Sequence, residues 1–264
     1  MGQKNGETGR GTGREVGRET GGAPSEREIA IGRLHLPAPA GDAATHPGLV
    51  LVHDVWGLTP HSRELGRLLA EAGFAVVEIA LYRDLAEPRV DDPGERIRSL
   101  DDRAVLADLD AAADWLAREA VCRGRRIGVI GVCMGGTYAL LAACHAERFS
   151  ASAPFYGLLS YDHGMNVGPQ GRDRGRKPSS PIESAHQLRM PLLASFGCED
   201  HFVPESDVDR LEQELAKSGV EHRVHRYAGA GHAFLNATRP DAHRPELATL
   251  ALGRAVDFLH EKLD

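Results

Sequence analysis

The chain has 264 residues with 42% hydrophobic and 26% charged residues, which is ordinary for a globular protein that can bury one large core. Its formal net charge of −7 argues against a nucleic-acid partner, because such proteins present a basic face. No run approaches the roughly 20 apolar residues that a membrane-spanning helix needs. The four cysteines lack metal-ligand spacing and indicate no disulfide framework, so we expect a cytoplasmic protein.

The first 25 residues differ in composition from the rest of the chain. Residues 1–25 are rich in glycine and alternating charges and have almost no apolar side chains, so we predict a disordered tail. They also lack the apolar core of a signal peptide. Residues 26–264 are expected to form a single domain with an inserted polar loop at about 160–186. This loop contains a basic run and is interpreted as either a solvated surface loop or a mobile flap near the active site.

Apolar periodicity predicts an alternation of strands and helices in the first part of the domain. A continuous apolar run such as Gly48–Val52 is typical of a strand covered on both faces. Leucines at helical spacing, stopped by Gly73, indicate the first helix. The elements predicted here are an alternating strand over 29–36, a strand over 48–52, a helix over 60–72, a strand over 74–79 and a helix that starts at 101–102.

The second part of the domain continues the same alternation. It comprises strands over 126–130, 151–156, 191–196 and 223–227, and helices that follow residue 133, span 205–217 and start at 245. Strands that alternate with helices of this length favour βαβ units. The sequence therefore predicts an α/β fold with a mostly parallel, doubly wound sheet and helices on both faces.

The most informative motif is Gly131-Val132-Cys133-Met134-Gly135-Gly136, between a predicted strand and a predicted helix. A nucleophile at the apex of a sharp strand-to-helix turn needs small neighbours, and a Cβ at Gly131 or Gly135 is expected to clash. The helix start supplies free N–H groups and a positive dipole end that stabilise a thiolate and an oxyanion. The alternative is close packing around an inert buried cysteine.

A thiol nucleophile needs a base, and the base needs an orienting acid. In a doubly wound sheet these groups come from loops at the carboxyl ends of strands. Asp200 follows one late strand and His232, in a Gly-Ala-Gly-His loop, follows the next. Asp200 could equally be an acid at a helix N-terminus, and His232 could be a histidine that merely lies in a turn.

With these motifs in this order, the chain from about Ile29 onward resembles the dienelactone hydrolase family of cysteine-dependent α/β-hydrolases. The resemblance rests on residues 51–58, 131–136, 197–204 and 231–234. It implies that Cys133 is the nucleophile, Asp200 the acid and His232 the base. It also places at position 54 an acid that restrains the resting thiol. Aspartate is shorter than the usual glutamate, so Asp54 is interpreted either in that role or as a structural hydrogen-bonding residue of its own loop.

The resemblance also indicates the oxyanion hole and the substrate pocket. The backbone N–H groups of Val55 and Met134 would hold the oxyanion. Arg83 stands where the family places an arginine for a substrate carboxylate, although a plain surface arginine is an equal interpretation. A second such arginine is missing, because that position holds Asn236. Apolar residues that could line the acyl pocket or simply belong to the core are Trp56, Phe155, Tyr156, Phe202 and Phe234.

We therefore predict a hydrolase of small carboxylic esters or lactones, without cofactor or metal, acting as a monomer or homodimer. A broad carboxylesterase or thioesterase with the same residues is the alternative enzyme, and a non-catalytic binding protein on the same fold is a second. Metal binding finds little support, because His222 and His225 would point to opposite faces of a strand. No G-x-G-x-x-G loop follows the first strand to suggest a dinucleotide.

Overall fold

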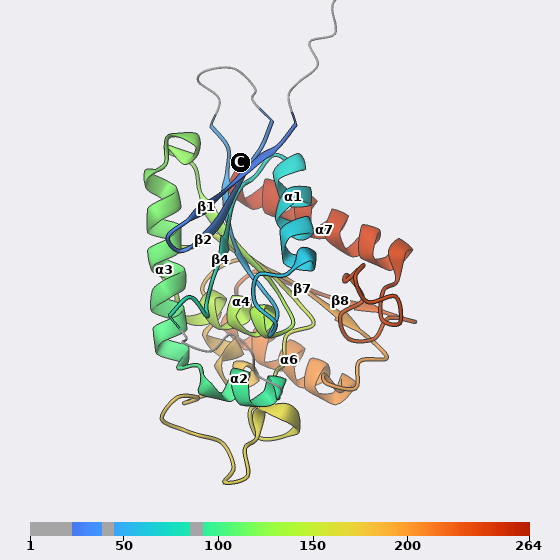
Figure 1. Cartoon of the computed structure of the whole chain (residues 1–264). Coiled ribbons are helices and arrows are strands. Elements are labelled where there is room, and N and C mark those ends of the chain that lie inside the picture. Colours follow the sequence, from blue (N-terminus) through green and yellow to red (C-terminus); the bar gives the residue numbers. More distant parts are fainter. Residues whose placement is uncertain (1–22, 39–44, 85–91) are drawn as a thin grey trace, which may run out of the picture.

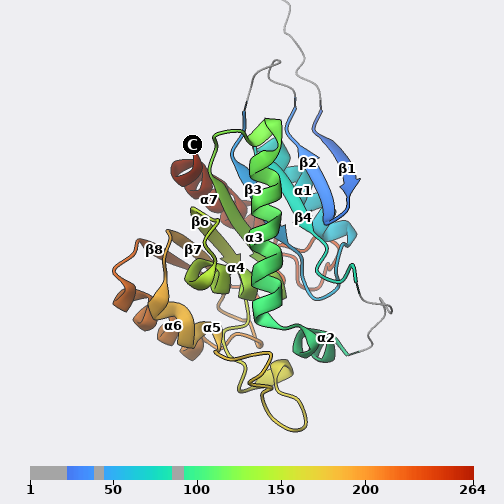
Figure 2. The ribbon, with the colours of Figure 1, turned by 90° about the vertical axis from the view of Figure 1, so that its left-hand side faces the viewer.

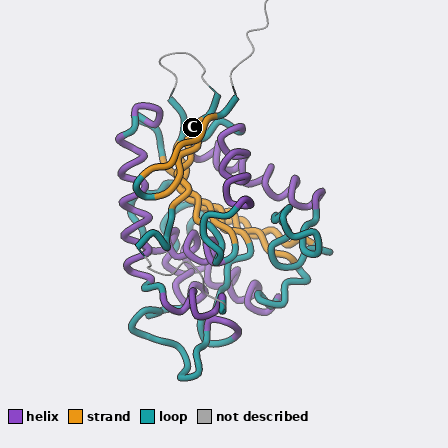
Figure 3. The backbone as a smooth tube through the Cα atoms, in the orientation of Figure 1, coloured by secondary structure: helices purple, strands orange, loops and turns teal. Residues whose placement is uncertain are grey.

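The computed structural model of the chain describes residues 23–38, 45–84 and 92–264. Within them, eight strands form one twisted sheet with helices packed on both faces (Figures 1 and 3). The strands are β1 (Ser25–Ile29), β2 (Gly32–Leu36), β3 (Gly48–Val52), β4 (Ala75–Ile79), β5 (Ile127–Val132), β6 (Ala151–Phe155), β7 (Leu192–Gly197) and β8 (His222–Tyr227).

The order of strands across the sheet is β1-β2-β4-β3-β5-β6-β7-β8. Strands β3 to β8 all run parallel to one another. The β1–β2 and β2–β4 pairs are antiparallel. The carboxyl ends of β3, β5, β7 and β8 therefore lie at the same edge of the sheet, and the loops that follow these strands meet there. This mostly parallel α/β sheet agrees with the predicted fold class.

The central strands are apolar throughout because both faces of the sheet are covered. Along β3, Val50 and Val52 pack into one hydrophobic cluster, and Leu49 and Leu51 pack into the other. Alternate side chains of a strand point to opposite faces, so a two-sided core requires a continuous apolar run. Each of these four side chains is fully buried.

Helices α1 and α7 lie on one face of the sheet, and α3, α4 and α6 lie on the other (Figures 1 and 2). The helices are α1 (Pro60–Glu71), α2 (Pro93–Ser99), α3 (Asp102–Arg118), α4 (Met134–His145), α5 (Pro181–Ser184), α6 (Glu205–Ser218) and α7 (Pro245–Leu263). Asp101 caps α3 by accepting from two backbone N–H groups, and Pro60 opens α1, as expected at helix starts. No described helix is long and apolar enough to cross a bilayer.

The N-terminal part of the domain corrects one prediction. The single strand predicted over 29–36 is wrong, because β1 and β2 form an antiparallel hairpin that turns just before Gly32. Gly32 has a φ of 148°, and an added Cβ would lie 2.0 Å from the carbonyl oxygen of Glu78. The short helix α2 was also not predicted. Of the predicted tail, residues 1–22 lie outside the described residues, and β1 already begins at Ser25.

The polar loop over 160–186 is anchored to the domain through a buried cation. Lys177 Nζ lies 2.7 Å from Asp102 Oδ1, at the start of α3, and 2.7 Å from the hydroxyl of Tyr138 on α4. Tyr161 donates to the same carboxylate. The Lys177 side chain is only 3% exposed, so this part of the basic run is packed rather than solvated. Met165 of the same loop reaches the cavity described below.

We expect Lys177→Met to lower the free energy of unfolding by about 3–5 kcal/mol, because the change leaves the Asp102 carboxylate buried without its countercharge. The measurement is urea unfolding followed by circular dichroism. Arg174→Met, at an exposed position of the same loop, is the matched control and is expected to change stability by less than about 0.5 kcal/mol. Equal stabilities of the two variants would contradict the anchoring role.

Candidate active site

Cys133 stands at the apex of the turn between β5 and α4. Its φ of 55° is a left-handed conformation that non-glycine residues rarely adopt. The turn is possible because its neighbours lack side chains: a Cβ on Gly131 would lie 2.1 Å from the Gly135 oxygen, and one on Gly135 would lie 2.0 Å from the Val52 oxygen. The predicted clashes at both glycines are thereby confirmed.

Three side chains from separate loops meet at this turn. Nε2 of His232, in the loop after β8, lies 3.1 Å from Sγ of Cys133. Nδ1 of the same ring lies 2.8 Å from Oδ2 of Asp200, in the loop after β7. The other oxygen of Asp200 accepts from the N–H of Phe202 at 2.8 Å, which fixes the carboxylate. Sulfur, imidazole and carboxylate therefore form one continuous hydrogen-bonded chain.

The imidazole of His232 is held between two aromatic rings and carries a perturbed pKa. Tyr156 and Phe202 contact it edge-on, with ring centroids 5.2 Å and 5.0 Å away. Burial opposes the charged ring, but the neighbouring Cys133 sulfur and the Asp200 carboxylate outweigh it and raise the pKa of His232. This environment favours an imidazolium beside the sulfur at neutral pH.

A cavity of about 120 Å³ opens above the Cys133 sulfur. Its wall combines the loops after β3, β5, β7 and β8 with Pro93 and with Met165 of the polar loop. Further residues that line it are Asp54, Val55, Trp56, His61, Tyr156, Phe202, Asn236 and Arg239. Pockets of this kind, mostly apolar with a few convergent polar groups, are typical of small-molecule sites.

Asp54 lies on the cavity wall and bonds within its own loop. Its Oδ1 accepts from the N–H of Trp56 at 2.8 Å, which matches the structural interpretation of the residue. Burial raises the pKa of the Asp54 carboxyl, and this effect exceeds the opposing hydrogen bond. The carboxyl shares the cavity with Cys133, and its hydrogen bond fixes the orientation of the loop that carries Val55.

The loop after β3 is fixed by a buried histidine to which the sequence analysis gave no role. Nδ1 of His53 lies 2.6 Å from the carbonyl of Asp54, and Nε2 accepts from the N–H of Leu81 at 3.2 Å. Burial lowers the pKa of His53 to about 4, so the ring stays neutral and can donate with one nitrogen and accept with the other. This arrangement holds the backbone next to Val55 against the end of β4.

Two residues predicted for substrate binding lie away from the cavity. The guanidinium of Arg83 pairs with Asp108 of α3 at 2.9 Å and borders a separate surface hollow. Phe234 is fully buried, where its ring packs against Tyr156 and Tyr227. Trp56 and Asn236 do line the cavity. Asn236 uses its side-chain oxygen to bond Thr238, so its amide shapes the loop as well as the wall.

Sequence reasoning missed four residues of the cavity wall, Pro93, Met165, His61 and Arg239. Arg239 is the seventh residue after His232, whereas the resemblance pointed to the fourth residue, Asn236. Its guanidinium pairs with Asp241 at 3.2 Å, and the two side chains are 49% and 72% exposed. His61 lies next to Pro60 at the start of α1. The sequence indicated a helix start at this position but gave no sign that the side chain lines a cavity.

The described part of the chain contains no group of three or more His, Cys, Asp or Glu side chains that could hold a metal ion. A sulfur, an imidazole in contact with it and a carboxylate that orients the imidazole meet at the cavity, and nucleophilic acyl transfer requires an arrangement of this kind. The mostly parallel sheet with helices on both faces, and with these side chains in the loops after β5, β7 and β8, has the architecture of the α/β-hydrolase fold.

Comparison with known proteins identifies the family within this class. The model of the dienelactone hydrolase family matches residues 35–263, so the chain belongs to that family. Over 81% of this chain and 83% of the relative, it is 32% identical to the "Probable 2-oxo-3-(5-oxofuran-2-ylidene)propanoate lactonase" of Bradyrhizobium sp. It is 30% identical to the "Carboxymethylenebutenolidase" of Rhodococcus opacus, over 87% of this chain and 86% of that one.

A solved structure supports the same fold. The crystal structure of the "Putative Dienelactone Hydrolase" from Klebsiella pneumoniae subsp. pneumoniae superposes with a TM-score of 0.78 at 24% sequence identity. The match covers 90% of this chain and 99% of that one. At this identity the similarity bears on the fold alone.

Proposed function

We propose that the protein hydrolyses carboxylic esters or lactones through a thioester intermediate on Cys133, with His232 as the acid–base and Asp200 as its orienting acid. The observation that carries the proposal is the 3.1 Å contact between Cys133 Sγ and His232 Nε2, continued by the 2.8 Å contact to Asp200. An imidazole in contact with the sulfur takes up the thiol proton, and the resulting ion pair leaves a nucleophilic thiolate.

The acylation step begins when the thiolate attacks the substrate carbonyl carbon and a C–S bond forms. Met134 is the first residue of α4, so its N–H has no acceptor within the helix, and the N–H of Val55 belongs to the facing wall. These two donors hold the developing oxyanion. The C–O bond then breaks as the Nε2–H of His232 gives its proton to the leaving oxygen.

The deacylation step uses the same base. His232, now neutral, removes a proton from water while the water oxygen attacks the thioester carbonyl. Collapse of the second tetrahedral intermediate breaks the C–S bond, releases the carboxylic acid and restores the ion pair of thiolate and imidazolium. Asp200 keeps the ring in the tautomer that presents Nε2 to the sulfur throughout the cycle.

We further propose that the substrate carries a carboxylate that Arg239 binds at the mouth of the cavity. The two relatives named above are a lactonase and a carboxymethylenebutenolidase, and both names denote substrates with an acidic group beside a lactone. Arg239 lines the cavity, whereas Arg83 is held by Asp108. A guanidinium with two parallel N–H groups suits a carboxylate.

The test of this function is a panel of esters and lactones assayed with the wild-type protein and Cys133→Ala. It includes a carboxylate-bearing dienelactone, a neutral lactone of similar size and p-nitrophenyl acetate. We expect turnover that depends on Cys133, with the anionic lactone preferred over the neutral one. Preference for the neutral esters would favour the broad carboxylesterase instead, and absence of any Cys133-dependent turnover would remove the proposal.

Arg239→Ala is expected to raise KM for the anionic lactone by about tenfold to 100-fold, because a charge-assisted hydrogen bond is worth about 1.5–3 kcal/mol. KM for p-nitrophenyl acetate should change by less than about twofold. Arg83→Ala is the matched control, since that arginine is paired away from the cavity and its removal should leave both KM values close to wild type. A larger effect of Arg83→Ala on the anionic substrate would contradict the assignment to Arg239.

A further inference from the structure

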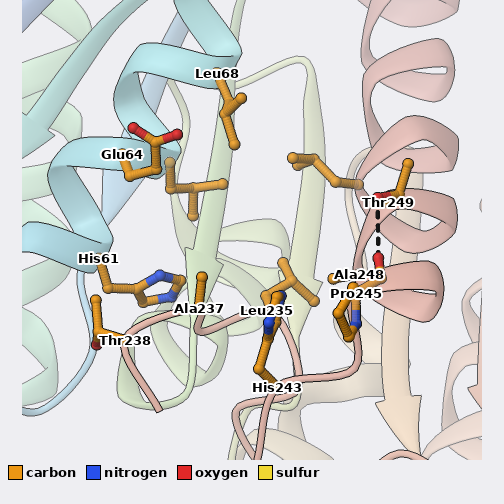
Figure 4. Close-up of a pocket in the computed structure, with 12 residues that line it drawn as sticks. His61, Glu64, Leu68, Leu235, Ala237, Thr238, His243, Pro245, Ala248 and Thr249 are labelled. Atoms are coloured by element: carbon orange, nitrogen blue, oxygen red, sulfur yellow. Dashed lines mark hydrogen bonds between the residues drawn. The ribbon is translucent and has the colours of Figure 1, made fainter. Parts of the chain in front are cut away.

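A second hollow, distinct from the catalytic cavity, lies between α1 and α7. This groove has a volume of about 240 Å³. Leu68 and Glu64 project from α1, and Ala248 and Thr249 belong to α7 (Figure 4). Leu65, Leu235 and Leu252 complete a mostly apolar wall. The carboxylate of Glu64 is paired with Arg67 of its own helix, so it leaves the groove without an unpaired charge.

The groove adjoins the catalytic cavity, and His61 lines both of them. Its ring extends from the start of α1 toward Ala237 (Figure 4). The segment 235–239 likewise separates the two spaces, with Asn236 and Arg239 on the catalytic side and Leu235 and Ala237 on the groove side. A ligand that occupied both spaces would pass along His61.

His61 provides a second, independent indication that a ligand binds here. The residue is only 6% exposed, and its Nε2 is buried without a hydrogen-bond partner in the described structure. Burial lowers the pKa of His61 to about 4, with a further contribution from His243, so the ring is neutral at pH 7. Buried polar atoms in proteins normally have partners, so a small rotation of the ring that exposed Nε2 to a polar atom of a bound substrate would be favourable.

We propose that the groove between α1 and α7 binds an apolar arm of the substrate, an alkyl or aryl group attached to the ester or lactone held at Cys133. The inference rests on the proposed ester hydrolysis and adds the chemical class of the substrate: an ester with a polar atom near the carbonyl, which bonds His61 Nε2, followed by an apolar group. The groove has room for roughly six to eight carbon atoms, taking about one water volume of 30 Å³ for each.

The test compares two series of substrates, because the arm could belong to the acid or to the alcohol. One series consists of p-nitrophenyl acetate, butyrate and hexanoate, and the other of ethyl, butyl and hexyl acetate followed by pH-stat titration. In one of the two series we expect kcat/KM to rise about threefold per added methylene, the gain expected from burying apolar surface. A flat profile in both series, with acetates still hydrolysed, would overturn the inference.

Two variants locate the effect in the groove. Ala248→Trp fills it from α7 and Leu68→Gln makes its α1 wall polar, and each should reduce the hexyl-to-short-chain ratio of kcat/KM by at least about fivefold. Leu250→Trp is the matched control, because Leu250 lies on the same helix, is 46% exposed and does not line the groove. It should keep the wild-type ratio.

The two failures are distinguishable. If both groove variants fold and keep the wild-type chain-length ratio, the groove assignment is overturned and the catalytic proposal stands. If no ester of either series is hydrolysed in a Cys133-dependent way, the proposed function itself falls, and the groove assignment falls with it.

Discussion

Cys133→Ala is expected to lower kcat/KM for p-nitrophenyl acetate by at least about 10³-fold while leaving the fold and its thermal transition unchanged. The sulfur is the atom that forms the covalent bond in the proposed cycle, and alanine offers no replacement. Little structural change is expected, because the side chain is small and alanine also fits the tight turn between Gly131 and Gly135. Initial rates and circular dichroism measure the two outcomes.

The control for this variant is another thiol of the same chain. Cys198 is half-buried, stands two residues before Asp200 and does not line the cavity. Cys198→Ala should keep kcat/KM within about threefold of wild type. Retention of wild-type turnover in Cys133→Ala would refute the nucleophile assignment, whatever the result for Cys198.

His232→Gln should lower kcat/KM by at least about 10³-fold, because the ring both draws the proton from the sulfur and protonates the leaving group. A second readout separates these roles from simple misfolding. The raised pKa of His232 keeps the imidazolium charge next to the sulfur at pH 7, and glutamine removes that charge. Alkylation of Cys133 by iodoacetamide at pH 7 should therefore slow by at least about tenfold.

His201→Gln is the matched control for the base. His201 follows Asp200 directly, is exposed and is not part of the hydrogen-bonded chain. Its replacement should leave both turnover and alkylation near wild-type rates. Unchanged alkylation in His232→Gln would mean that the sulfur does not depend on this ring, and the proposed ion pair would have to be abandoned.

The fold could be predicted from sequence where the physical cause is local. The apolar run Gly48–Val52 indicates a strand covered on both faces, and its side chains indeed divide between two cores. The steric demand of the turn at Cys133 is also local, because Gly131 and Gly135 are needed within a few residues of the nucleophile. Chain order then placed the predicted acid and base after the last two strands, β7 and β8, whose carboxyl ends share one edge of the sheet with β5.

The remaining features depend on partners that are distant in sequence. Arg83 is withdrawn from the cavity by Asp108 on a helix that begins 19 residues later, and no local pattern announces that pair. Lys177 belongs to a loop that looks solvated, yet its ammonium is paired with Asp102 in the core. The short helix α2 did have local signals, because Asp92 caps it and Pro93 follows directly. Its seven residues are too few for an apolar periodicity to reinforce these signals.

The central claim is that the sulfur of Cys133 carries the acyl group during turnover. Its most direct measurement is to mix the wild-type protein with p-nitrophenyl acetate, quench with acid within the first turnovers and map the acetylated peptide by mass spectrometry. We predict an acetyl group on Cys133 that is absent from the Cys133→Ala variant. Acetyl on a different residue, or rapid turnover with Cys133 never acetylated, would contradict the account.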